Sequence, residues 1–134
     1  MSNNQHEKKI IATDQAPKAL GPYSAGVSTG TMVFTAGQIG IDPETGKMVE
    51  GGVPAQTKQI FENLKAILEE AGTSLDMIVK TTVFLQDIGD FSQMNEVYAS
   101  FFTGNYPARS AFQVGALPGG AMVEIEAIAL LPNK

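Results

Sequence analysis

The chain has 134 residues, 43% of them hydrophobic and 17% charged, which is typical of one globular domain. The net charge of −5 argues against nucleic acid as the main partner, because phosphate backbones are bound through Lys and Arg. The chain has no cysteine, which excludes disulfides, thiolate nucleophiles and cysteine-ligated zinc.

The ends of the sequence are polar. Residues 1–8 are predicted to be a flexible N-terminal tail and residues 9–132 a single domain. The only histidine, His6, falls in the tail, so neither histidine catalysis nor a metal site is expected. The stretch 127–131 is too short to cross a bilayer, and no hydrophobic leader is recognisable. We therefore expect a cytoplasmic protein without a membrane partner, metal or cofactor.

The first half of the domain reads as short strands followed by a long helix. The predicted strands are 9–13, 24–27 and 31–36, with turns at 28–30 and 42–46. From Pro54 to Ala71 the apolar residues recur at helical spacing, and Gly72 predicts the end of this helix. Its apolar stripe predicts core packing against a sheet.

The second half alternates strands with one more helix. Strands are predicted over 78–86, 109–116 and 122–131, and Asp90 to Gln93 resembles a capping box for a helix that ends near Thr103. In the strand 78–86, Val79 is expected on one face with Thr81, and Ile78 on the other.

This order predicts an α+β fold with a single mixed β-sheet and two helices on one face. One helical layer leaves the other face of the sheet uncovered, and Ala127 and Ala129 are expected there against water. Closing several such sheets into a barrel would cover that face, which points to a homo-oligomer with clefts between copies.

Arg109 is the only arginine of the chain and lies in an apolar strand. A guanidinium stays charged and can hold a carboxylate or phosphate through two parallel hydrogen bonds. Glu124 and Glu126 share one face of the last predicted strand. For Glu124 a structural acid and a general base are both plausible, whereas a structural or exposed role is expected for Glu126. The alternative for Arg109 is an internal ion pair with one of these glutamates.

Two further positions are candidates for the same cleft. Tyr23 could contribute a phenol, or it could be an aromatic residue at the edge of the sheet. Gly37 ends a strand where backbone amides can approach a ligand closely, although no phosphate-loop pattern follows it.

Several segments in this order and spacing resemble the Rid/YjgF family of reactive-intermediate deaminases over about residues 9–131. They are Gly21-Pro22-Tyr23-Ser24, Ala36-Gly37-Gln38-Ile39, 79–85, Asn95 with Tyr98 and Phe101-Phe102, Pro107-Ala108-Arg109-Ser110, and Val123-Glu124-Ile125-Glu126-Ala127-Ile128-Ala129. The resemblance implies a chorismate-mutase-like fold, a homotrimer with a central barrel, and sites in the clefts between subunits.

The resemblance also implies an activity, the hydrolysis of small 2-imino acids such as 2-iminobutanoate and 2-iminopropanoate to 2-keto acids and ammonia. Arg109 would hold the substrate carboxylate and Glu124 would activate a water, which needs neither a metal nor a cofactor. Tyr23, Gly37 and Ala111 would line the site, the last two through their backbones.

The sequence departs from common family patterns at three positions. Ala36 stands where many relatives have Ser, Gly89 where Asn is frequent, and Ala111 where Cys is frequent. Two other functions remain open: an RNA-directed activity, since relatives are also called endoribonuclease L-PSP or translation initiation inhibitor, and a non-catalytic trimer that binds carboxylate metabolites.

Overall fold

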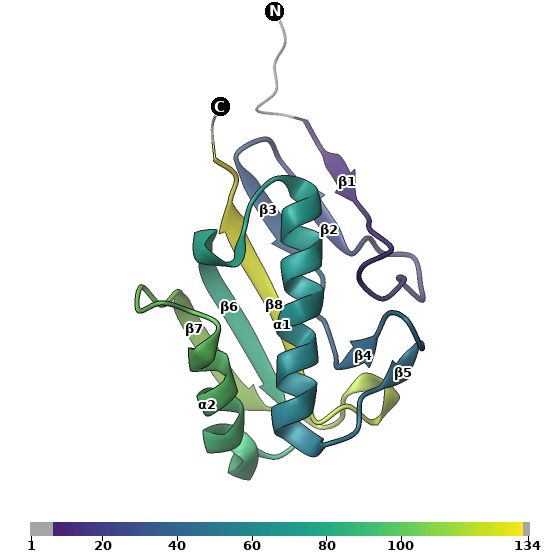
Figure 1. Cartoon of the computed structure of the whole chain (residues 1–134), viewed down its shortest axis with the longest axis vertical. Helices are drawn as coiled ribbons and strands as arrows, with labels where there is room; N and C mark the ends of the chain where they lie inside the picture. The colour runs from purple at the N-terminus through teal and green to yellow at the C-terminus, as the bar shows by residue number, and fades with distance from the viewer. Residues whose placement is uncertain (1–6, 133–134) are drawn as a thin grey trace, which may run out of the picture.

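The computed structural model describes residues 7–132, and the order of its elements confirms the predicted α+β fold (Figure 1). His6 and the rest of 1–6 lie outside the described residues. The strands are β1 (Lys9–Ile11), β2 (Gly26–Ser28), β3 (Met32–Thr35), β4 (Ile41–Asp42), β5 (Lys47–Met48), β6 (Ile78–Leu85), β7 (Ala108–Gln113) and β8 (Val123–Leu130). The helices are α1 (Gly52–Ala71) and α2 (Phe91–Ser100), with short 3₁₀ turns η2 (Leu75–Met77), η3 (Ile88–Asp90) and η4 (Pro118–Gly120).

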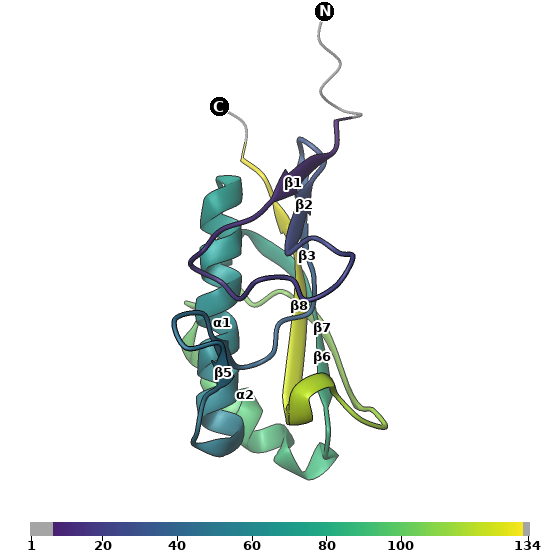
Figure 2. The same ribbon diagram turned by 90° about the vertical axis from the view of Figure 1, so that its right-hand side faces the viewer.

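The main sheet has six strands in the order β1-β2-β3-β8-β6-β7. Its pairs are antiparallel except β6 and β7, which are parallel because α2 carries the chain back across the sheet between them. Strands β4 and β5 form a separate hairpin that the sequence predicted only as a turn. Both helices lie on one side of the main sheet, as the edge-on view in Figure 2 shows.

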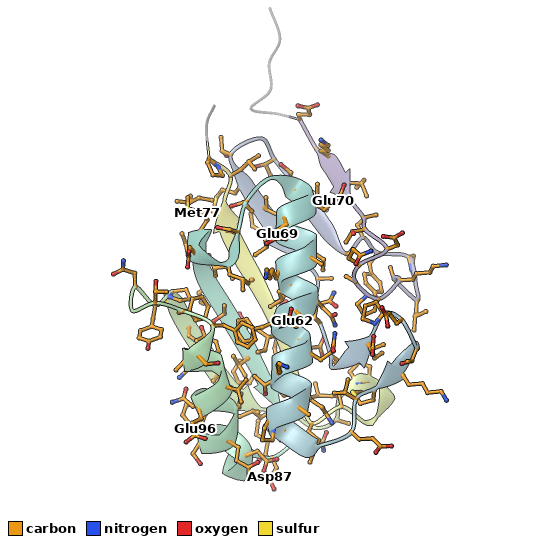
Figure 3. All side chains as sticks on the ribbon, in the orientation of Figure 1. Glu62, Glu69, Glu70, Met77, Asp87 and Glu96 are labelled. Carbon is orange, nitrogen blue, oxygen red and sulfur yellow. The ribbon has the colours of Figure 1, made fainter. Side chains whose placement is uncertain are left out.

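Helix α1 is the main element of the core. Its buried residues recur at helical spacing, and Gly72 ends the helix in the left-handed region at φ 96°. Phe61 is fully buried and links the two helices, because its ring stacks on Phe101 at 4.8 Å and meets Tyr98 edge-on at 5.3 Å. The outer side of the helical layer carries charged side chains: Figure 3 shows Glu62, Glu69 and Glu70 along α1 and Glu96 on α2.

The burial pattern of strand β8 shows which side of the sheet the helices cover. Its odd-numbered residues from Val123 to Ala129 are buried under the helices, and its even-numbered residues are less buried. The expectation that Ala127 and Ala129 face water is therefore wrong, since they are 2% and 0% exposed. The open face instead carries Glu124, Glu126 and Ile128.

Two local predictions are corrected by the backbone. A β-bulge between Ile78 and Lys80 places Ile78 in the core and leaves Val79 39% exposed, so the predicted faces are exchanged at this end of β6. The capping box is also absent, because Asp90 makes no side-chain bond to α2. Asp87 accepts a bond from the Gly89 amide instead and caps η3.

Within residues 7–132, neither helix combines the length and apolar character that a membrane crossing requires.

Replacing Phe61 by Ala should destabilise the protein by about 3–5 kcal/mol, since a large buried aromatic would leave a cavity between α1 and α2. Urea unfolding at a fixed protein concentration measures this. Lys65→Ala, at an exposed position of the same helix, is the control and should change stability by less than about 0.5 kcal/mol. Equal stability of the two variants would contradict the central position assigned to Phe61.

Candidate functional site

A pocket of about 640 Å³ lies at one end of the sheet, between residues from segments 14–25 and 37–46 and the start of β8. We call it the Glu124 pocket, because Glu124 contributes a carboxylate to an otherwise largely apolar lining that includes Leu20, Ile39 and Ile41. A concave apolar pocket with a few polar groups is the usual form of a small-molecule site.

Glu124 reaches the pocket because Gly37 has no side chain. The chain after β3 runs beside β8, where Gln38 pairs with Ile125, and this brings Gly37 against the Glu124 side chain. A Cβ on Gly37 would overlap Glu124 Oε2 and would lie 2.9 Å from its Cδ. Glycine is thus required at position 37 to make room for the carboxylate, a reason that the sequence did not reveal.

The pKa of the Glu124 carboxyl is raised above its ordinary value, chiefly by burial and secondly by the negative charge of Glu126. A half-buried carboxylate with a raised pKa is a better proton acceptor than an exposed one at the same position. This environment fits the predicted general base.

The two sides of the pocket are built differently. On one side, the buried Asn63 of α1 donates from Nδ2 to the carbonyls of Ile39 (3.4 Å) and Ile41 (3.0 Å) and so ties segment 39–41 to the helix. On the other side, Tyr23 lines the pocket but remains 54% exposed, and its hydroxyl accepts a long 3.5 Å bond from the Leu20 amide.

Arg109 lies elsewhere, on the edge strand β7 beneath α2. Its Nη1 donates to Asn95 Oδ1 at 2.6 Å, and its guanidinium lies 4.7 Å from the centre of the Tyr98 ring and 5.3 Å from that of Phe91. The side chain is half-buried, and the contacts given above, to Asn95, Tyr98 and Phe91, are with neutral side chains.

Arg109 and Glu124 are therefore not brought together within the chain. Arg109 pairs in register with Thr81, whose buried side chain is on the helix side, whereas Glu124 pairs with Phe84 on the open side. The alternative of an internal ion pair with Glu124 or Glu126 is wrong for the same reason. Ala111 is on the helix side of β7 with Arg109, and its backbone belongs to a strand with a single strand neighbour.

Asn95 and Phe91 are the contacts of Arg109 that residue-by-residue reasoning missed. Their spacing with Tyr98, four and then three residues, places all three on one side of a helix, and that signal was present in the sequence. It could not show which strand lies beneath this side, because that depends on how α2 crosses the sheet.

The model of the family described as Endoribonuclease L-PSP matches residues 13–131. The chain belongs to this family, which is also the YjgF/Rid family, and the predicted resemblance is confirmed.

Proteins that are similar to this chain over nearly its full length carry several different names. A RutC family protein of Pyrococcus abyssi is 53% identical over 91% of this chain and 96% of its own. The 2-iminobutanoate/2-iminopropanoate deaminase of Mus musculus is 49% identical over 92% of this chain and 90% of its own. The crystal structure of E. coli TdcF with bound serine is 48% identical, covers 91% of this chain and 98% of its own, and superposes with a TM-score of 0.86.

Gly37→Ala should displace the Glu124 carboxylate and destabilise the protein by roughly 1–3 kcal/mol, since overpacking a filled site forces the neighbour to move. Thermal unfolding and a crystal structure of the variant measure the two effects. Gly115→Ala is the matched control, because a Cβ there meets nothing within 4 Å. An unmoved Glu124 in the Gly37→Ala protein would contradict the steric argument.

Proposed function

We propose that this protein hydrolyses small 2-imino acids to 2-keto acids and ammonia in sites shared between copies of the chain. The observation that carries the proposal is the Glu124 carboxylate in its apolar pocket, with a pKa raised by burial and by Glu126. The Mus musculus relative named 2-iminobutanoate/2-iminopropanoate deaminase supports the reaction type at 49% identity.

In the proposed mechanism Arg109 binds the substrate carboxylate through two parallel hydrogen bonds and fixes the imine carbon. Glu124 accepts a proton from a water as the water oxygen bonds to this carbon. Glu124 then returns the proton to the nitrogen. As the C–N bond breaks and ammonia leaves, Glu124 accepts the hydroxyl proton of the carbinolamine, so that the C=O bond of the 2-keto acid forms. A protonated imine is already electrophilic, so the residues present are sufficient for this chemistry.

Two copies are needed because Arg109 and Glu124 point to opposite sides of one sheet. The open side also exposes large apolar residues, Phe34 (39%), Phe112 (45%) and Leu130 (43%), whose burial would stabilise an assembly. We therefore propose a homotrimer in which Glu124, Tyr23 and Gly37 of one copy meet Arg109 and Ala111 of the next. The serine bound in E. coli TdcF supports a small ligand with a carboxylate.

A complementation experiment tests the composite site. Arg109→Ala and Glu124→Gln should each lower kcat/KM by about 10²–10⁴, measured as keto acid release from freshly generated 2-iminobutanoate. Co-expression of the two variants should restore activity, because about a quarter of the clefts then pair an intact Glu124 with an intact Arg109.

Arg109→Lys separates charge from geometry, since Lys keeps the charge without the planar pair of donors. Wild-type turnover by Arg109→Ala or by Glu124→Gln would contradict the role assigned to that residue. An inactive mixture would contradict the site between copies. Binding of 2-ketobutanoate without turnover by the wild type would favour the carboxylate-binding alternative, and salt-sensitive RNA cleavage would favour the RNA-directed one.

The pH profile gives an independent test of Glu124. Removing the charge of Glu126 with Glu126→Gln should lower the pKa of Glu124, because that charge raises it in the native protein. Since the base must be ionised to accept a proton, the acidic limb of kcat/KM against pH should move to lower pH. An unmoved limb would mean that another group titrates there.

A further inference from the structure

We propose that Asn95 is a positioning residue for the reaction and that α2 sets the direction in which Arg109 presents its free donors. This inference rests on the proposed function, in which Arg109 binds a carboxylate. It goes further by assigning the orientation of the guanidinium to a neutral side chain on a neighbouring element.

The first observation is the hydrogen bond itself. Arg109 Nη1 donates to Asn95 Oδ1 at 2.6 Å in a half-buried setting, a short bond of the charge-assisted kind. An amide oxygen holds the guanidinium without neutralising it, whereas a carboxylate in the same place would compete with the carboxylate of a substrate. Asn95 is thus a tether that preserves the positive charge.

The second observation is the pair of rings that flank the guanidinium. Tyr98 lies 4.7 Å and Phe91 5.3 Å from Arg109 Cζ, both within the range of cation–π attraction. Tyr98 is itself fixed, because its hydroxyl and Thr81 Oγ1 are hydrogen-bonded at 2.6 Å and its ring meets Phe61 edge-on. The aromatic core of the protein therefore holds the surface against which Arg109 rests.

The third observation concerns the nitrogens of the Arg109 guanidinium that have no hydrogen-bond partner among the described residues. Among residues 7–132, the Arg109 guanidinium has one hydrogen-bond partner, and it is bound at Nη1. Nε and Nη2 form the other edge of the fork, the edge that can bind a carboxylate through two parallel bonds. With one edge tethered and two rings close to the guanidinium, this free edge is held in a single orientation before a ligand arrives, which reduces the entropic cost of binding.

The single arginine makes the inference directly measurable, because a ¹⁵N-labelled sample has one arginine Nε–H signal. In the wild type this signal should be sharp and should shift when 2-ketobutanoate, the stable reaction product, is added. In Asn95→Ala the side chain loses its tether, so the signal should broaden or move, and the Kd for 2-ketobutanoate should rise about tenfold. KM for the imine should rise by more than kcat falls.

Asn95→Asp separates positioning from a packing role. Asp has nearly the shape of Asn, so a packing role alone predicts that it is tolerated better than Ala. The inference predicts the reverse order of affinity, wild type above Ala above Asp, because the new carboxylate neutralises Arg109. Asn95→Asp also keeps the proposal testable if the Asn95→Ala variant does not fold.

Glu96→Gln is the control, since Glu96 is the next residue but is exposed on the outer side of α2 (Figure 3). It should leave the Arg109 signal, the Kd and kcat/KM unchanged. An unchanged Arg109 signal and Kd in Asn95→Ala, or wild-type affinity in Asn95→Asp, would overturn the inference. A wild type that neither binds 2-ketobutanoate nor turns over the imine would contradict the proposed function, while the Arg109 signal would still report whether Asn95 holds the side chain.

Discussion

The alternation of side chains along β8 is the constraint on which the other features depend. Odd positions bury Val123, Ile125, Ala127 and Ala129 under the helices, so even positions must point to the uncovered side. Glu124 can be half-buried and still reachable only because it is on that uncovered side, at the end where the chain after β3 runs alongside. The same alternation puts Arg109 of β7 out of its reach. A single chain thus holds two incomplete halves of one proposed site.

The sequence predicts features that depend on local interactions better than features that depend on contacts between distant segments. Helix α1 and the faces of β8 follow from local periodicity, which is why the apolar stripe of α1 and the shared face of Glu124 and Glu126 were predicted correctly. The bulge near Val79 was missed because one extra residue exchanges the faces without changing the pattern on either side of it. Ala127 and Ala129 were predicted on the open side of the sheet but lie on the covered side. Small residues are typical of close helix packing as well as of exposed strands.

The arrangement of the candidate site could be predicted only in part for the same reason. The residue types that suit the chemistry could be recognised along the chain, but the relation of Arg109 to Glu124 depends on the register of β7 against β6 and of β6 against β8. Both registers join segments far apart in the sequence. The close approach of Gly37 to Glu124 and the tether from Asn95 to Arg109 are likewise contacts between elements, so composition and spacing did not reveal them.

The two sides of the Glu124 pocket differ in how they are anchored, which bears on the range of ligands that the proposed site would accept. Asn63 fastens segment 39–41 to the longest helix, whereas residues 18–22 are exposed and the bonds described around Tyr23 are local. A segment held by few, exposed interactions opens at low free-energy cost, while one anchored to a core helix does not. Glu124 is on β8, which pairs with Gln38 next to the anchored segment, so differences in the size of a ligand should be accommodated by residues 18–22. For the proposed reaction, selectivity for the size of the substrate should consequently be gradual rather than sharp.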